Sequence, residues 1–168
     1  MKHLFILSIL LISSIHLSAQ GTAKSAKVDK AAKINWLTLE EAQELNKTSP
    51  KKIIVDLYTE WCGPCKMMMQ QTFTDSQLIS YINENFYAVK FNAESQAPVN
   101  FKGKVYNNPT FDPTRSARQR NGVHEYTMTT GLRGYPTLII YNTEVEIIKR
   151  IVGFQRAPQV IRQLKKLK

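Results

Sequence analysis

The chain has 168 residues, of which 43% are hydrophobic and only two are cysteine, and its formal net charge is +10. This length suits a single domain with a buried core, and so few cysteines exclude a scaffold built from disulfides. The 23 basic residues are spread along the chain, without a groove motif or an aromatic-basic platform. The positive charge therefore indicates solubility or attraction to acidic partners, and no nucleic acid is expected to bind.

Residues 1–19 form a segment of their own. Lys2 gives a short positive region, the apolar run Leu4–Ile12 follows, and Ala19 is a small residue before Gln20. This order is typical of a secretory signal peptide, so we expect export to the periplasm and no stable membrane insertion after cleavage. Polar residues make the apolar segment short for a spanning helix, although an uncleaved anchor is the alternative.

The domain proper is expected to span residues 34–168. Residues 20–33 before it are mostly Ala, Lys, Ser and Thr with almost nothing to bury, which predicts a flexible lead-in. Thr38 and Glu41 have the spacing of a capping box, and they predict the start of the first helix.

An apolar strand predicted at Lys52–Tyr58 leads into the sequence WCGPCK, which contains both cysteines. A helix is expected to begin near Pro64, because proline suits the first helical turn, where a missing N–H costs nothing. Cys62 would then precede a helix whose free N–H groups and dipole stabilise a thiolate. Cys65 would lie about one turn further on, close enough to form a disulfide with Cys62. The pattern predicts one activated sulfur and one that resolves it.

A C-x-x-C pair has two other uses, as part of a metal site and as a structural disulfide. A zinc site needs more Cys or His ligands than the chain offers after residue 19, where only Cys62, Cys65 and His124 remain. A disulfide that closes so short a loop constrains little of the unfolded chain. Redox chemistry is therefore favoured, and no metal is expected. His124 is expected on a helix surface, with a catalytic base for Cys62 as the alternative.

The rest of the chain alternates between helical and β-prone segments. Lys66–Gln71 is helical by propensity, and Thr74 or Asp75 can cap a second helix. Further elements are expected in the order strand, helix, strand, strand and helix, at Phe86–Asn92, Val123–Thr130, Thr137–Tyr141, Glu146–Val152 (ended by Gly153) and from Pro158 onward.

Three of these segments resemble the thioredoxin family. Ile53–Lys66, IIVDLYTEWCGPCK, matches the family's strand, buried acid and active-site pattern, and Val89–Phe91 and Gly134–Thr137 match in the expected order. The C-x-x-C-K…T-F-x-D layout is similar to the C-terminal domain of the transmembrane disulfide-interchange reductase of bacterial envelopes. The resemblance implies an α/β thioredoxin fold, with a mixed central β-sheet flanked by helices and an insertion before the cis-proline strand.

The insertion, at about residues 95–121, exceeds what a minimal thioredoxin needs. Val99–Tyr106 predicts a hairpin that turns at Lys102-Gly103, and Arg115–Arg120 predicts a solvated basic run. Such a segment is either a partner-binding element or a tolerated surface excursion, and the sequence leaves both open.

The resemblance assigns catalytic roles to four residues. Cys62 is the expected nucleophile and Cys65 the less exposed resolving cysteine, so the redox-active disulfide itself is the only cofactor expected. Asp56 lies within an apolar strand and would be desolvated, with a raised pKa. The matching family acid helps to deprotonate the resolving cysteine, whereas the alternative for Asp56 is a strand-end acid facing water. Lys90 matches the lysine that pairs with this acid, with a solvated strand lysine as the alternative.

The resemblance also implies a substrate-binding surface. Pro136 matches the cis-proline opposite the active site, and an ordinary trans proline that starts a strand is the alternative. Tyr135 departs from the smaller or aliphatic residue common before this proline, which puts the family's substrate preference in doubt here. The surface is expected to consist of Trp61, Gly63, Pro64, Tyr135, Pro136 and Gly153.

These features predict a monomeric thiol-disulfide oxidoreductase that mainly reduces protein disulfides in the cell envelope. The Gly-Pro dipeptide between the cysteines resembles reducing members of the family, and a membrane reductase is the expected electron donor. One alternative is a disulfide oxidant or isomerase that uses the same cysteines. The other is a chaperone or binding module in which the insertion acts and the cysteines are incidental.

Overall fold

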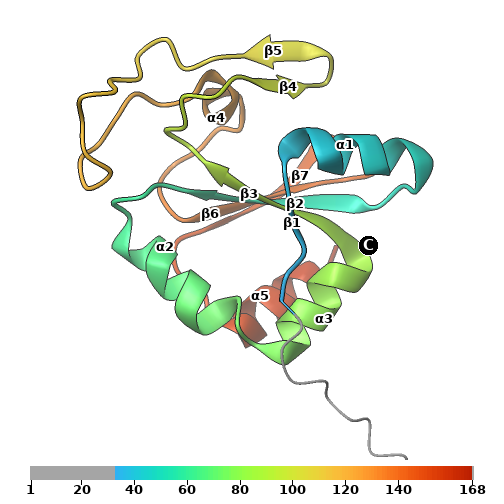
Figure 1. Ribbon diagram of the computed structural model, residues 1–168. Coiled ribbons are helices and arrows are strands. Elements are labelled where there is room, and N and C mark those ends of the chain that lie inside the picture. Colours follow the sequence, from blue (N-terminus) through green and yellow to red (C-terminus); the bar gives the residue numbers. More distant parts are fainter. Residues whose placement is uncertain (1–32, 168) are drawn as a thin grey trace, which may run out of the picture.

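A five-stranded sheet in the order β1-β3-β2-β6-β7 forms the centre of the computed structural model (Figure 1). The structure describes residues 33–167, so the predicted signal peptide at residues 1–19 and nearly all of the predicted lead-in lie outside the described residues. The described part includes no helix both long and apolar enough to cross a membrane. Its elements are β1 Trp36–Leu37, α1 Leu39–Thr48, β2 Lys52–Tyr58, α2 Gly63–Met67, the π-helical turn η1 Met68–Thr72, α3 Ser76–Asn85, β3 Phe86–Asn92, β4 Val99–Phe101, β5 Lys104–Tyr106, α4 Glu125–Thr129, β6 Thr137–Tyr141, β7 Ile147–Val152 and α5 Ala157–Leu164.

Strand β2 lies in the middle of the sheet, parallel to β3 and antiparallel to β6. Its residues Ile53–Leu57 are all buried, because other elements cover both faces of the sheet. The predicted mixed sheet flanked by helices is therefore confirmed, and β2, β3 and β6 have the predicted bounds.

Alternate residues of β2 point into two hydrophobic cores on opposite faces of the sheet. Ile54 packs with Leu78 of α3 and Leu164 of α5 in the first core. Val55 packs with Leu39 of α1 in the second. Figure 1 shows this division, with α2, α3 and α5 on one side of the sheet and α1, α4 and the β4–β5 hairpin on the other.

Local capping signals set the helix starts. The predicted capping box of α1 is present, since Thr38 Oγ1 accepts from the Glu41 N–H and Glu41 Oε2 accepts from the Thr38 N–H. Of the two predicted caps for α3, Asp75 is the one used, and its Oδ1 accepts from the Leu78 N–H at 2.9 Å.

The hairpin of the insertion is docked on α1 through hydrogen bonds. It turns at Lys102 and Gly103, as predicted, and both residues have positive φ. The Asn100 N–H donates to Glu40 Oε1 at 2.7 Å, and Gln43 Nε2 donates to the Asn100 carbonyl at 2.8 Å. The side chains of α1 therefore satisfy backbone groups at the edge of the hairpin.

The insertion also contributes to the second core. Phe101 of β4 is only 6% exposed, and its ring contacts Tyr126 and Tyr141 with centroids 5.0 and 5.4 Å apart. The insertion is thus part of the hydrophobic core and is more than a surface excursion.

Strand β1 and helix α4 differ from the sequence prediction. The short strand β1, which pairs in parallel with β3, was not predicted, because two residues give no periodicity. Helix α4 begins at Glu125 and is shorter than the predicted Val123–Thr130.

The prediction that His124 lies on a helix surface is wrong. The side chain is fully buried and forms the N-cap of α4, where Nδ1 accepts from the Tyr126 N–H at 3.1 Å. Its Nε2 lies 3.1 Å from the Ala97 carbonyl oxygen, so the hydrogen-bond network assigns the proton to Nε2. Burial lowers the pKa of His124. Because both ring nitrogens have hydrogen-bond partners within the fold, the role of His124 is structural.

Candidate active site

Cys62 lies at the junction between β2 and α2, where it is the N-cap of the helix. Its Sγ accepts a hydrogen bond from the Cys65 N–H at 3.1 Å and forms a disulfide with Cys65. The Cα atoms of the two cysteines lie 5.3 Å apart. Pro64 falls in the first turn of α2, as predicted. The same N–H group and the helix dipole are placed to stabilise a Cys62 thiolate once the disulfide is reduced.

Both cysteines are nearly buried in this oxidised form. Cys62 is 2% exposed and Cys65 is 4% exposed, so the prediction that Cys65 is the less exposed of the two is wrong for this state. Trp61 and Tyr135 line the same cavity as Cys62. A partner must therefore approach Cys62 through this cavity.

Asp56 lies inside the fold, on the face of the sheet that α2 covers. Its register partner on β6 is Leu138, which belongs to the core covered by α3 and α5, so Asp56 points to the same face of the sheet as α2. Asp56 is 2% exposed, and the Oδ1 atom of its carboxyl group has no hydrogen-bond partner among the described residues. Burial raises the pKa of Asp56 to about 7, and the nearby charge of Lys90 partly opposes this rise.

Lys90 is the register partner of Asp56 on β3, yet the two side chains form no ion pair in the described structure. The Lys90 ammonium instead lies over the ring of Tyr58, 3.8 Å from its centroid. The pairing predicted for Lys90 is therefore wrong as a direct contact, although its charge still acts on Asp56.

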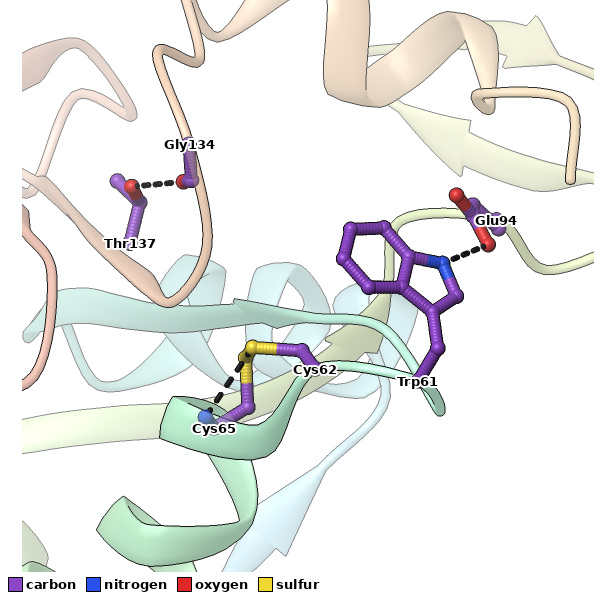
Figure 2. The surroundings of a disulfide bond; sticks show 6 residues. All are labelled: Trp61, Cys62, Cys65, Glu94, Gly134 and Thr137. Carbon is purple, nitrogen blue, oxygen red and sulfur yellow. Dashed lines mark hydrogen bonds between the residues drawn. A yellow bond between two sulfur atoms is a disulfide. The ribbon is translucent and has the colours of Figure 1, made fainter. Parts of the chain in front are cut away.

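Trp61 connects the active site to the insertion. Its Nε1 donates to Glu94 Oε2 at 2.8 Å, a contact that Figure 2 shows beside the disulfide. The Arg120 guanidinium lies over the indole, 4.9 Å from the ring centroid, and Tyr135 meets the indole edge to face at 5.7 Å. One aromatic residue is thus held by three partners from distant parts of the chain.

An open cavity of about 660 Å³ lies above Cys62. It is lined by residues of the C-x-x-C turn, the insertion and the segment before β6, namely Trp61, Cys62, Gly63, Pro64, Glu94, Arg120, Asn121, Val123, Arg133, Gly134 and Tyr135. Four of the predicted substrate-binding residues therefore share one cavity with the sulfur of Cys62. The arrangement can hold a chain that carries a disulfide or thiol against Cys62.

Two other predicted substrate-binding residues lie beside this cavity and do not line it. The Tyr135–Pro136 peptide bond is cis, as predicted. The Gly153 N–H donates to the Pro136 carbonyl at 2.8 Å, which ties the end of β7 to the start of β6. The Thr137 hydroxyl donates to the Gly134 carbonyl at 2.7 Å and holds the loop that faces the disulfide (Figure 2).

Three charged residues of the cavity, Glu94, Arg120 and Arg133, were not among the predicted site residues. Glu94 follows β3, and adjacent parallel strands end at the same edge of a sheet, so its position after the strand was a usable signal. Arg120 belongs to a run predicted only to be solvated, and Arg133 stands in a segment without regular structure. No cluster of at least three potential metal-binding side chains occurs within the described range.

The chain matches known proteins over most of its length. The profile of the thioredoxin-like domain family covers residues 39–168. The thiol:disulfide interchange protein DsbD of Tatumella citrea is 27% identical over 128 residues, which is 75% of this chain but only 18% of that protein. This chain thus spans less than a fifth of the length of that relative.

Two solved structures have a similar fold. A proposed disulphide-isomerase from Bacteroides thetaiotaomicron has a TM-score of 0.56 and 28% identity, covering 80% of this chain and 93% of its own. The oxidised C-terminal domain of DsbD from Neisseria meningitidis has a TM-score of 0.52 and 18% identity, with 77% and 91% covered. With its fold and its C-x-x-C pair, the chain belongs to the thioredoxin-like domain family.

Proposed function

We propose that this protein reduces disulfide bonds of other proteins in the periplasm, by cycling Cys62 and Cys65 between dithiol and disulfide. The observation that carries the proposal is the Cys62–Cys65 disulfide at the start of α2, in which Cys62 lines an open cavity. A structural disulfide has no need of a cavity at its sulfur, whereas an exchange reaction needs room for a second chain.

The reaction has two thiol–disulfide exchanges. The Cys62 thiolate attacks one sulfur of the substrate disulfide, forms a mixed disulfide and releases the other substrate sulfur as a thiolate. The Cys65 thiolate then attacks the Cys62 sulfur, which closes the Cys62–Cys65 disulfide and releases the second substrate thiolate. Two electrons pass from the protein to the substrate, and two protons end on the substrate thiols.

Asp56 is suited to accept the proton of Cys65. A pKa of about 7 leaves this carboxyl group partly ionised near neutral pH, so it can take up and return a proton there. Its face of the sheet is the one that α2 covers, and Cys65 is the buried residue of α2. Lys90 adjusts the charge balance at Asp56 from its place over Tyr58.

Export and the electron donor belong to the same proposal. The charged, then apolar, then small-residue order of residues 1–19 supports secretion across the inner membrane. In an oxidising compartment the protein needs a donor of two electrons, and a membrane dithiol reductase is the class that fits. The likeness to an interchange protein, DsbD, supports this choice.

A second candidate, disulfide isomerase or oxidant, is supported by the structural relative from Bacteroides thetaiotaomicron. The reduction potential of the Cys62–Cys65 pair separates the two directions. We expect a value near −270 mV, as in reducing thioredoxins, whereas a value near about −120 mV would show an oxidant.

The central experiment measures reduction of insulin disulfides by the mature protein with a dithiol donor. Cys62→Ser should abolish the activity, because no nucleophile remains to form the mixed disulfide. Cys65→Ala should instead accumulate mixed disulfides with envelope proteins when expressed in the native host, since the resolving sulfur is missing. If the Cys62→Ser protein retains full activity, or if the Cys65→Ala protein traps no partner, the proposal fails.

A further inference from the structure

Two arginine residues line the cavity above Cys62. Arg120 comes from the insertion and Arg133 from the segment before β6, and both side chains belong to exposed residues. In the described range, neither forms an ion pair with a carboxylate. Glu94, the acidic residue of the cavity, is only 7% exposed, and its Oε2 accepts from Trp61. The accessible charge among the residues that line this cavity is therefore positive.

The position of Arg120 is set by the fold of the insertion. Its guanidinium lies over Trp61, and its carbonyl oxygen accepts from Arg115 Nη1 at 2.8 Å. The next residue, Asn121, exchanges hydrogen bonds with the Asp112 backbone at 2.7 and 2.9 Å. Because these contacts hold the loop, Arg120 loses little conformational freedom when it binds a ligand.

We propose that Arg120 and Arg133 are specificity residues for disulfide substrates that carry a carboxylate next to the reacting cysteine. The inference rests on the proposed function and names the substrate class of the same cavity. Arginine suits this role because its planar fork pairs with a carboxylate through two hydrogen bonds. The remaining wall, Trp61 and Tyr135, supplies aromatic surface for the neighbouring backbone.

The pairing acts while the substrate sulfur approaches Cys62. The substrate carboxylate binds between the two guanidinium groups, and the Cys62 thiolate attacks the adjacent sulfur. The second substrate sulfur leaves as a thiolate, and Cys65 later displaces the first one and closes the protein disulfide. The arginines take no part in bond making or breaking. They lengthen the time for which the acidic chain stays bound in the cavity.

The test compares disulfide-linked homodimers of three short peptides in which the cysteine is flanked by Asp, by Asn or by Lys. The second-order rate constant for reduction by the pre-reduced full-length protein is divided by that for reduction by dithiothreitol. This division removes the effect of the flanking residues on the leaving thiol. We expect Asp to exceed Asn and Asn to exceed Lys, with a preference that shrinks in high salt.

The variants separate a local site from the general positive charge. Arg120→Gln and Arg133→Gln should each lower the Asp-to-Asn ratio about threefold, as expected for a partly exposed ion pair. Arg118→Gln is the matched control, because Arg118 lies in the same basic run but does not line the cavity. Arg120→Lys keeps the charge and should keep most of the preference. Arg118→Gln should leave both the rate with the Asn peptide and the Asp-to-Asn ratio near the wild-type values.

Each result has a defined meaning. Equal normalised rates for the three peptides, with the Asn peptide still reduced, would overturn the substrate class and leave the proposed function standing. An equal loss of preference in Arg118→Gln and Arg120→Gln would assign the effect to overall charge and overturn the site. If no peptide is reduced, the proposed function itself fails.

Discussion

Asp56 shows how strongly one residue can be altered by its surroundings. In water the pKa of an aspartate lies well below neutral pH. Here the carboxyl group is enclosed by an apolar strand and a hydrophobic core. No described group donates a hydrogen bond to its Oδ1, and Lys90 lies over Tyr58. Desolvation therefore dominates, and the pKa of Asp56 rises to about 7.

Asp56→Asn should change how stability depends on pH. Because the pKa of Asp56 is 3.8 unfolded and about 7 folded, the folded state holds a proton that the unfolded state has lost between these values. Stability of the oxidised wild type should therefore fall by about 3 kcal/mol from about pH 5 to about pH 8 through this group.

Urea unfolding of the oxidised wild type and of oxidised Asp56→Asn at about pH 5 and about pH 8 measures this change in stability. The variant should lack the loss of stability that Asp56 causes in the wild type. His124 remains in both proteins, and its lowered pKa acts in the opposite direction, so the difference between the proteins isolates Asp56. The same pH dependence in both proteins would contradict the assignment.

At the scale of the elements, helix starts carry both stability and chemistry. Thr38 and Asp75 cap α1 and α3 with oxygen acceptors, whereas α2 is capped by the sulfur of Cys62. The free N–H groups of a first turn need an acceptor, and a thiolate is a good one. The need of the first N–H groups for an acceptor thus stabilises the starts of α1 and α3, and at α2 it favours a thiolate at Cys62.

Thr38→Ala should lower the free energy of unfolding by about 1 kcal/mol, because the Glu41 N–H loses its acceptor. Chemical denaturation of the oxidised protein measures the change. Thr38→Ser keeps the hydroxyl group and should stay within about 0.5 kcal/mol of the wild type. Equal losses in the two variants would mean that the methyl group, and not the cap, stabilises α1.

At the scale of the whole molecule, the insertion joins the core to the active site. Its hairpin places Phe101 against Tyr126 and Tyr141, and its final loop places Arg120 over Trp61. The segment is therefore held at one end by the hydrophobic core and meets the redox site at the other. Removing it would expose the second core as well as the cavity.

Phe101→Ala should destabilise the protein by about 3–5 kcal/mol, the range typical of a buried phenylalanine. Val105, on the other strand of the same hairpin, is 55% exposed, and Val105→Ala should change stability by less than about 0.5 kcal/mol. Denaturant unfolding monitored by circular dichroism compares the two. A small effect of Phe101→Ala would show that the hairpin is only a surface excursion.

The sequence predicted best where local patterns are strong. The apolar run of β2, the capping box of α1 and the hairpin turn at Lys102 were all found, because each depends on neighbours in the chain. Strand β1 was missed because it is short, and His124 was misplaced because its burial depends on Ala97 and Phe91, which lie far away in sequence.

The sequence by itself indicated the fold class, through its resemblance to the thioredoxin family, and the redox pair, since a C-x-x-C between an apolar strand and a helix start has few other uses. Only the tertiary structure decided what surrounds that pair. Glu94, Arg120 and Arg133 meet at Cys62 through strand register and loop placement, which no local pattern encodes. The conformation of Lys90 was decided in the same way, by the ring of Tyr58 beside it. The position of the C-x-x-C pair is thus set by neighbours in the chain, and the side chains that surround it are set by neighbours in space.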